Sequence, residues 1–196
     1  HEATGRPGRP RGLIHRDVTP QNLLMSFDGR VLLGDFGVAL IQAYGDTDPG
    51  EVLGKLGYLA PEAVVMEEVD RRADVFAAGV MLYELLLDTR LYEGEEDDVM
   101  ARIADARVPR PRRISEILPR ELEQVLFRSL AKKPRDRFQS AAEMAQALRP
   151  FWSDRLANPY ALASLLAATN PEQAGSWRQR SIFMKSTRDL GGQLPI

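Results

Sequence analysis

The 196-residue chain contains no cysteine. This absence excludes a disulfide-built scaffold and a thiolate metal site. It also agrees with a reducing compartment, so we expect a cytoplasmic protein. Long apolar runs are missing as well, since no stretch approaches the roughly 20 residues that a membrane-spanning helix needs. The formal net charge is only −2, which gives no reason to expect nucleic acid or an anionic membrane as the main partner.

Lysine is absent from the N-terminal part of the chain, where Lys55 is the first one. Three glycines precede it in an Arg/Pro-rich stretch at positions 5, 8 and 12, without strand-like alternation. Their spacing is not that of a G-x-G-x-x-G phosphate loop. We therefore interpret this stretch as a turn or surface hairpin.

What the chain does contain is a series of motifs that carry oxygen ligands. Residues 14–22 read IHRDVTPQN and residues 33–37 read LGDFG. They place Asp17 and Asn22 five positions apart, and Asp35 thirteen positions further on. Hard carboxylate and amide oxygens suit a small cation such as Mg²⁺.

Later segments extend the pattern. Residues 57–62 read GYLAPE, residues 74–80 read DVFAAGV and residues 133–138 read KPRDRF. With the first two motifs, these segments resemble the eukaryotic-type protein kinase family, in which they correspond to the catalytic loop, the D-F-G segment, the A-P-E segment, the central helix and a late arginine. Five motifs in family order argue against chance agreement.

The resemblance implies a role for each residue of the first two motifs. Asp17 would accept the hydroxyl proton of a protein substrate, and Asn22 and Asp35 would hold the magnesium ions that bridge the ATP phosphates. Leu24 matches the floor of the adenine site. ATP and Mg²⁺ are therefore the expected cofactors, and a protein is the expected substrate.

Three further residues match structural positions of the family. Asp74 would accept backbone N–H groups of the His-Arg-Asp turn, although an acidic residue in a first helical turn is also favoured by the helix dipole alone. Glu62 and Arg137 match a buried ion pair that fastens the end of the activation segment to the late helices. Breaking such a pair typically costs about 3–5 kcal/mol.

Two positions depart from the family pattern. Thr19 stands where most Ser/Thr kinases carry a phosphate-binding lysine, and Lys55 stands where the family usually has a threonine. Our hypothesis is a compensated exchange, in which Lys55 supplies the ammonium and the Thr19 hydroxyl orients Asp17. The alternative is that Lys55 is a solvated loop residue and that the site is impaired.

Regulation is the least defined part of the pattern. In the family, an arginine at the position of Arg16 can bind a phosphorylated residue of the activation segment. Thr47 is a possible phosphosite, Glu51 offers a permanent carboxylate instead, and the third interpretation is an exposed acidic loop. The sequence leaves these alternatives open.

Periodicity and turn residues predict a mainly α fold with short β-hairpins. We expect strands over 23–27 and 30–33, a long irregular activation segment over 35–62, and a buried helix over 73–87. Further helices are expected over 122–130, 141–148 and 162–168, with Pro134 separating the first two. The resemblance implies a kinase C-terminal lobe whose N-terminal lobe would come from upstream sequence.

We thus predict a kinase catalytic domain, as a C-lobe fragment, over residues 1–152. A partly helical or disordered extension would follow over 153–196. The expected function is ATP-dependent Ser/Thr protein phosphorylation in bacterial signalling, with the fragment inefficient alone. A pseudokinase-like scaffold is the first alternative, which the intact Asp17, Asn22 and Asp35 disfavour. A small-molecule phosphotransferase is the second, which the A-P-E segment and Arg137 disfavour. Thr19 and Lys55 replace the residues that usually discriminate between Ser/Thr and Tyr acceptors. The sequence therefore separates these two acceptor types less sharply.

Overall fold

The computed structural model describes residues 14–35, 55–109, 118–151 and 159–175. The chain divides into two units, the first formed by His1–Leu23 and Leu33–Phe151 and the second by Leu24–Leu32 and Trp152–Ile196. Thr47 and Glu51, which the sequence analysis connects with regulation, lie outside the described residues.

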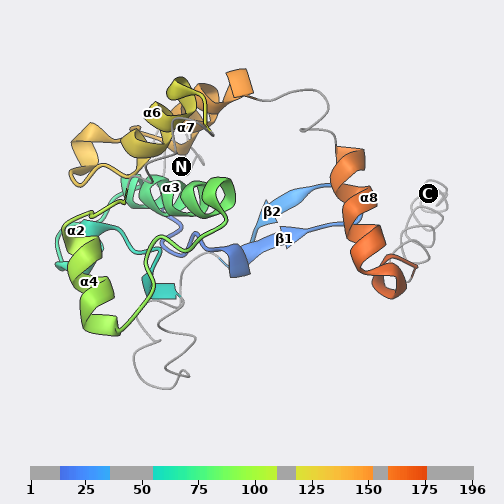
Figure 1. Cartoon of the computed structure of the whole chain (residues 1–196), viewed down its shortest axis with the longest axis horizontal. Helices are drawn as coiled ribbons and strands as arrows, with labels where there is room; N and C mark the ends of the chain where they lie inside the picture. The colour runs from blue at the N-terminus through green and yellow to red at the C-terminus, as the bar shows by residue number, and fades with distance from the viewer. Residues whose placement is uncertain (1–13, 36–54, 110–117, 152–158, 176–196) are drawn as a thin grey trace, which may run out of the picture. The chain divides into compact units, whose positions relative to one another are not determined.

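The first unit is helical. Its elements are η1 (Pro20–Asn22), α2 (Pro61–Val64), α3 (Arg72–Leu87), α4 (Glu96–Ala104), α6 (Arg120–Ser129), η2 (Pro134–Asp136), α7 (Ala141–Leu148) and η3 (Arg149–Phe151). Helix α3 packs against α6 and α7, and α2 packs against α4 (Figure 1). The mainly helical class expected from the sequence is confirmed.

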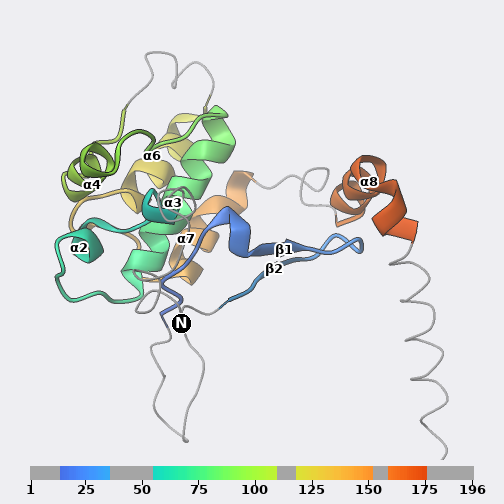
Figure 2. The same cartoon turned by 90° about the horizontal axis from the view of Figure 1, so that it is seen from below.

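Helix α3 lies between the other helices of this unit (Figure 2). Its first part is buried, and Val75, Phe76 and Val80 have no exposed surface. The last turn differs from the expectation of a helix buried throughout, since Leu85 is 79% exposed. The apolar residues cover most of the helix circumference, but the neighbouring helices cover only part of its length.

The contact between α3 and α6 depends on a glycine. A Cβ atom on Gly79 would lie 3.0 Å from Ser129 Cβ and would overlap the hydroxyl oxygen of the same residue. Ser129 is fully buried, and its hydroxyl donates to Leu126 O at 2.6 Å within α6. Gly79 therefore lets the two helices approach closely.

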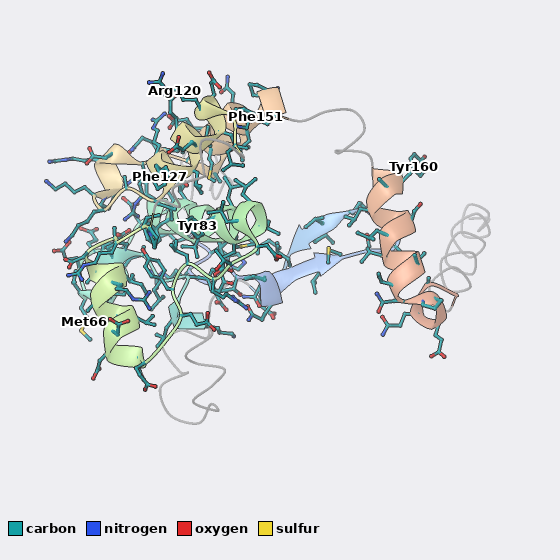
Figure 3. The ribbon with its side chains drawn as sticks, in the orientation of Figure 1. Met66, Tyr83, Arg120, Phe127, Phe151 and Tyr160 are labelled. Carbon is teal, nitrogen blue, oxygen red and sulfur yellow. The ribbon has the colours of Figure 1, made fainter. Side chains whose placement is uncertain are left out.

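Two apolar clusters form the interior of the first unit. The larger surrounds α3 and includes Tyr83, which lies among the helices in Figure 3. The smaller joins Val75 to Val125, Phe138 and Met144 from α6, α7 and the segment between them. Helix α3 contributes to both clusters, so it connects the late helices to the catalytic segments.

The hairpin has β1 (Leu23–Met25) and β2 (Val31–Leu33) as an antiparallel pair. Gly29 closes the turn with a positive φ of 81°, which glycine adopts without strain. The sequence predicted this hairpin and its Asp-Gly turn, although the strands are shorter than expected. The exposed side chains of both strands are apolar, namely Leu24, Met25, Val31, Leu32 and Leu33.

The described part of the second unit also contains α8 (Pro159–Thr169), which covers the helix expected over 162–168 and begins at the proline that was expected to precede it. Tyr160 and Leu165 on this helix are exposed. Among the described helices, none combines the length and the hydropathy required to cross a lipid bilayer.

Candidate active site

Asp74 holds the backbone of the catalytic loop. Its Oδ2 accepts the N–H of His15 and its Oδ1 accepts the N–H of Arg16, each at 2.8 Å. Asp74 is 5% exposed. Burial raises its pKa above the usual range of an aspartate, and the two backbone donors oppose this rise only in part.

The backbone is strained at two positions of the site. Arg16 and Asp35 have positive φ values of 66° and 50°. Non-glycine residues in the left-handed region cost about 1–3 kcal/mol, and such residues cluster at functional sites. The two hydrogen bonds to Asp74 offset this cost at Arg16.

The His15 ring connects the catalytic loop to the turn before Asp35. Its Nδ1 accepts the N–H of Asp17 at 3.3 Å, and its Nε2 lies 2.9 Å from Gly34 O. Because Nδ1 is the acceptor, the ring proton stands on Nε2, which then donates to the carbonyl. His15 is 4% exposed. No role was predicted for this histidine from the sequence, although its place in the His-Arg-Asp motif was the available signal.

Asn22 fixes the orientation of Asp17. Its amide nitrogen donates to both the backbone oxygen and Oδ2 of Asp17, each at 2.8 Å. The backbone oxygen of Asn22 accepts the N–H of Gly34 at 2.8 Å. The structure thus brings together the two motifs that the sequence places at Asp17–Asn22 and Asp35.

The donor set of this site fits Mg²⁺. Because the Asn22 amide nitrogen is engaged with Asp17, its amide oxygen faces away from that residue, and Asp35 offers an exposed carboxylate. Within the described ranges, no group of three His, Cys, Asp or Glu side chains forms a metal site. Mg²⁺ does not require one, since it usually binds through one or two protein oxygens, substrate phosphates and water.

Lys55 also approaches Asp17. Its Nζ lies 3.8 Å from Asp17 Oδ2, and the Asp17 side chain is only 11% exposed. Thr19 is 1% exposed, and its hydroxyl oxygen has no hydrogen-bond partner among the described residues. The hydrogen bond by which Thr19 was expected to orient Asp17 is thus not formed, and the Asn22 amide occupies that role in the structure.

Glu62 and Arg137 form a buried bidentate ion pair. Two guanidinium nitrogens donate to the two carboxylate oxygens, each at 2.7 Å, and the side chains are 4% and 0% exposed. The remaining donors of Arg137 bind the backbone oxygens of Ala131, Lys132 and Arg72 at 2.8, 2.9 and 3.0 Å. The A-P-E segment is therefore fastened to α3 and to the turn after α6.

A second network, formed by Tyr58, Glu84 and Arg90, also holds this segment. The Tyr58 hydroxyl donates to Glu84 Oε2 at 2.6 Å, and Arg90 contacts both residues. Burial and the Glu84 carboxylate raise the Tyr58 pKa. Glu84 was not predicted as a site residue, although it is the one charged residue between positions 75 and 87.

The structure also describes Arg16 and Leu24, the two remaining predicted site residues in the described ranges. Arg16 is exposed and lines a cavity of about 430 Å³ together with Tyr58, Ala60 and Asp74. Met66, at the rim of the same cavity, is 94% exposed and lies at the edge of the unit in Figure 3. Leu24 is 58% exposed on β1, in the second unit.

Comparison with known sequences identifies the family. The model of the family described as "Protein kinase domain" matches residues 10–152. The chain belongs to the protein kinase family. This match includes the catalytic loop, the A-P-E segment and the late arginine, and it ends close to the end of η3.

Kinases from several bacteria are similar to the chain. The tyrosine-protein kinase MasK of Myxococcus xanthus is 40% identical over 164 residues, which cover 83% of this chain and 25% of the relative. The serine/threonine-protein kinase PknL of Mycobacterium tuberculosis is 37% identical over 150 residues, covering 76% of this chain and 37% of the relative. The serine/threonine-protein kinase PknB of Mycolicibacterium smegmatis is 36% identical over 181 residues, which cover 86% of this chain and 28% of the relative.

Two facts follow from these relatives. The chain spans between about a quarter and somewhat more than a third of their length. Their names include both tyrosine and serine/threonine kinases, so family membership does not by itself define an acceptor residue.

Proposed function

We propose that the protein to which this chain belongs is an ATP-dependent protein kinase of the bacterial eukaryote-like kind, with a signalling role in the cytoplasm. The observation that carries the proposal is the orientation of Asp17. Asn22 holds its carboxylate at 2.8 Å, and Asp74 holds the adjoining backbone. A scaffold would not require this arrangement of a proton acceptor.

In this proposal Asp17 accepts the proton from the hydroxyl group of the protein substrate as that oxygen attacks the terminal phosphorus of ATP. The bond from this phosphorus to the bridging oxygen breaks, and ADP leaves. The Asn22 amide keeps one carboxylate oxygen in place, so the second oxygen faces the incoming hydroxyl. Bound Mg²⁺ would neutralise charge on the phosphates. The amide oxygen of Asn22 and the carboxylate of Asp35 would hold it, and Leu24 would contact the adenine.

The proposed acceptor is a serine or threonine of a protein, which is the acceptor type named for PknL and PknB. The Tyr58 and Glu62 networks hold the A-P-E segment as a rigid platform, which suits an extended peptide. This platform also disfavours a small-molecule phosphotransferase. Residues outside this chain would supply the Gly-rich loop and the phosphate-binding lysine that the family template requires, because residues 1–54 contain no lysine.

The decisive experiment is transfer of labelled phosphate from ATP and magnesium by the product of the full reading frame. Asp17→Asn should lower the rate at least about 100-fold, since general-base catalysis contributes 10²–10⁴-fold. Asp105→Asn is the matched control, because Asp105 is a half-exposed aspartate that pairs only with surface cations among the described residues.

Acid hydrolysis of the labelled product identifies the acceptor. Phosphoserine or phosphothreonine is expected, and phosphotyrosine alone would contradict that part of the proposal. An unsubstituted protein that binds partners but transfers no phosphate would favour the scaffold alternative.

A further inference from the structure

The backbone at Lys55 is fixed by buried neighbours. The N–H of Tyr58 donates to Lys55 O at 3.1 Å, and the N–H of Leu59 donates to Leu56 O at 3.0 Å. Leu56 and Tyr58 are 5% and 4% exposed. Gly57 packs so closely that a Cβ atom there would lie 3.2 Å from Tyr92 O. The turn therefore presents the Lys55 side chain from a fixed base.

The Lys55 ammonium group is available for a further ligand. Its Nζ lies 3.8 Å from Asp17 Oδ2, which is too long for a hydrogen bond. Among the described residues, no hydrogen bond of this ammonium is formed, so none of them occupies its three N–H donors. The side chain is 39% exposed, whereas that of Asp17 is 11% exposed. The Lys55 side chain is thus more accessible to solvent than the carboxylate that it approaches.

The side chain at position 19, where most Ser/Thr kinases of the family carry a lysine, has no charge. Thr19 is buried, and its hydroxyl oxygen has no hydrogen-bond partner among the described residues. The amide of Asn22 already binds Asp17 Oδ2 at 2.8 Å. Within the described part of the chain, the ion pair of Asp17 is formed with Lys55. In the structure, Asn22 orients the Asp17 carboxylate, and Lys55 places a positive charge beside it.

We infer that Lys55 is a catalytic residue that donates hydrogen bonds to the phosphoryl group during its transfer, and that the Thr19 hydroxyl is dispensable. This inference rests on the proposed kinase function. An ammonium within 4 Å of the proton acceptor stands where negative charge develops as the phosphoryl group moves to the substrate oxygen. Because the turn at Lys55 directly precedes the A-P-E residues in the chain, a single segment would provide both the charge and the platform for the peptide.

The test compares substituted forms of the full-length kinase. Lys55→Met should lower kcat about 100-fold or more, as loss of one transition-state donor does, while the KM for ATP changes less than about threefold. Lys55→Arg should restore part of kcat because it retains the charge. Thr19→Val, which removes only the hydroxyl, should keep kcat within about threefold of the original value.

Lys132→Met is the matched control, because Lys132 is an exposed lysine whose Nζ lies 3.2 Å from a surface aspartate, Asp105. Its kcat should be unchanged. Lys55→Met should also keep the thermal midpoint of the unsubstituted protein, since a partly exposed ion pair contributes little stability. A loss of kcat without a loss of stability is therefore the expected pair of results.

Each contrary result has a defined meaning. Full activity of Lys55→Met in a protein that Asp17→Asn inactivates would overturn the inference and leave the kinase function standing. A 100-fold loss in Thr19→Val would overturn the assignment of orientation to Asn22. Absence of transfer by the unsubstituted protein would overturn the proposed function and the inference together.

Discussion

At the scale of single residues, Asp74 shows how burial and hydrogen bonding compete. Its carboxylate accepts two backbone N–H groups at 2.8 Å, which stabilises the charged form. Burial disfavours the same form and is the larger effect, so the pKa is raised. The site retains this costly charge because a neutral side chain of the same shape could not accept both donors.

The raised pKa predicts a pH dependence of stability. The unfolded protein releases the Asp74 proton near the ordinary value of about 3.9, whereas the folded protein retains it to higher pH. Folded protein therefore binds more protons in that interval, and the contribution of Asp74 to the free energy of unfolding decreases as pH rises through it. Urea unfolding of the unsubstituted protein and of Asp74→Asn, measured from about pH 3.5 to pH 7, isolates this slope.

The difference in the free energy of unfolding between the unsubstituted protein and Asp74→Asn should decrease as pH rises from the unfolded to the folded pKa of Asp74. Above the folded pKa this difference should no longer change with pH. At neutral pH, Asp74→Asn should lower the free energy of unfolding by about 1–3 kcal/mol, because the amide nitrogen faces a backbone N–H. A parallel pair of pH curves would contradict the prediction.

At the scale of elements, the Glu62–Arg137 pair connects the A-P-E segment to the helices that follow. Arg137→Ala should lower the free energy of unfolding by about 3–5 kcal/mol, because it leaves a buried carboxylate unpaired. Urea denaturation measures the change. Arg107→Ala is the control, since Arg107 pairs with Asp105 on the surface and its loss should cost about 1 kcal/mol or less. Equal losses in the two variants would refute the structural role.

The α3–α6 contact supports a second prediction at this scale. Gly79→Ala should destabilise the protein by about 1–3 kcal/mol, because the added methyl group overlaps Ser129. Adding Ser129→Ala removes the hydroxyl and should recover part of the loss, although the Cβ atoms remain only 3.0 Å apart. Thermal unfolding of the single and double variants measures the coupling, and a fully stable Gly79→Ala protein would disprove the close approach.

At the scale of the whole molecule, the proposed catalytic residues account for only part of the phosphate-binding apparatus. Since positioning and electrostatics supply nearly all of the catalysis in this reaction class, the isolated 196-residue chain should transfer phosphate at least about 100-fold more slowly than the full-length protein. Parallel assays with labelled ATP measure the ratio. Equal rates would show that these residues suffice.

The family, the mainly helical class, the Asp-Gly hairpin and the helices around Leu122 and Met144 could be predicted from the order of the amino acids alone. Motif spacing and periodicity report local geometry, and both are readable in one dimension. The sequence also selected Asp17, Asn22 and Asp35 as a group. Their order along the chain matches the phosphoryl-transfer template before any contact is known.

The geometry of the long-range contacts comes from the tertiary structure. The family resemblance predicted that Asp74 would meet the His-Arg-Asp turn and that Glu62 would meet Arg137, and the structure adds the atoms that join them across 59 and 75 positions. It also decided that Asn22 rather than Thr19 binds Asp17. Such pairings depend on how α3 packs against its neighbours, and side-chain periodicity does not encode a contact between separate segments.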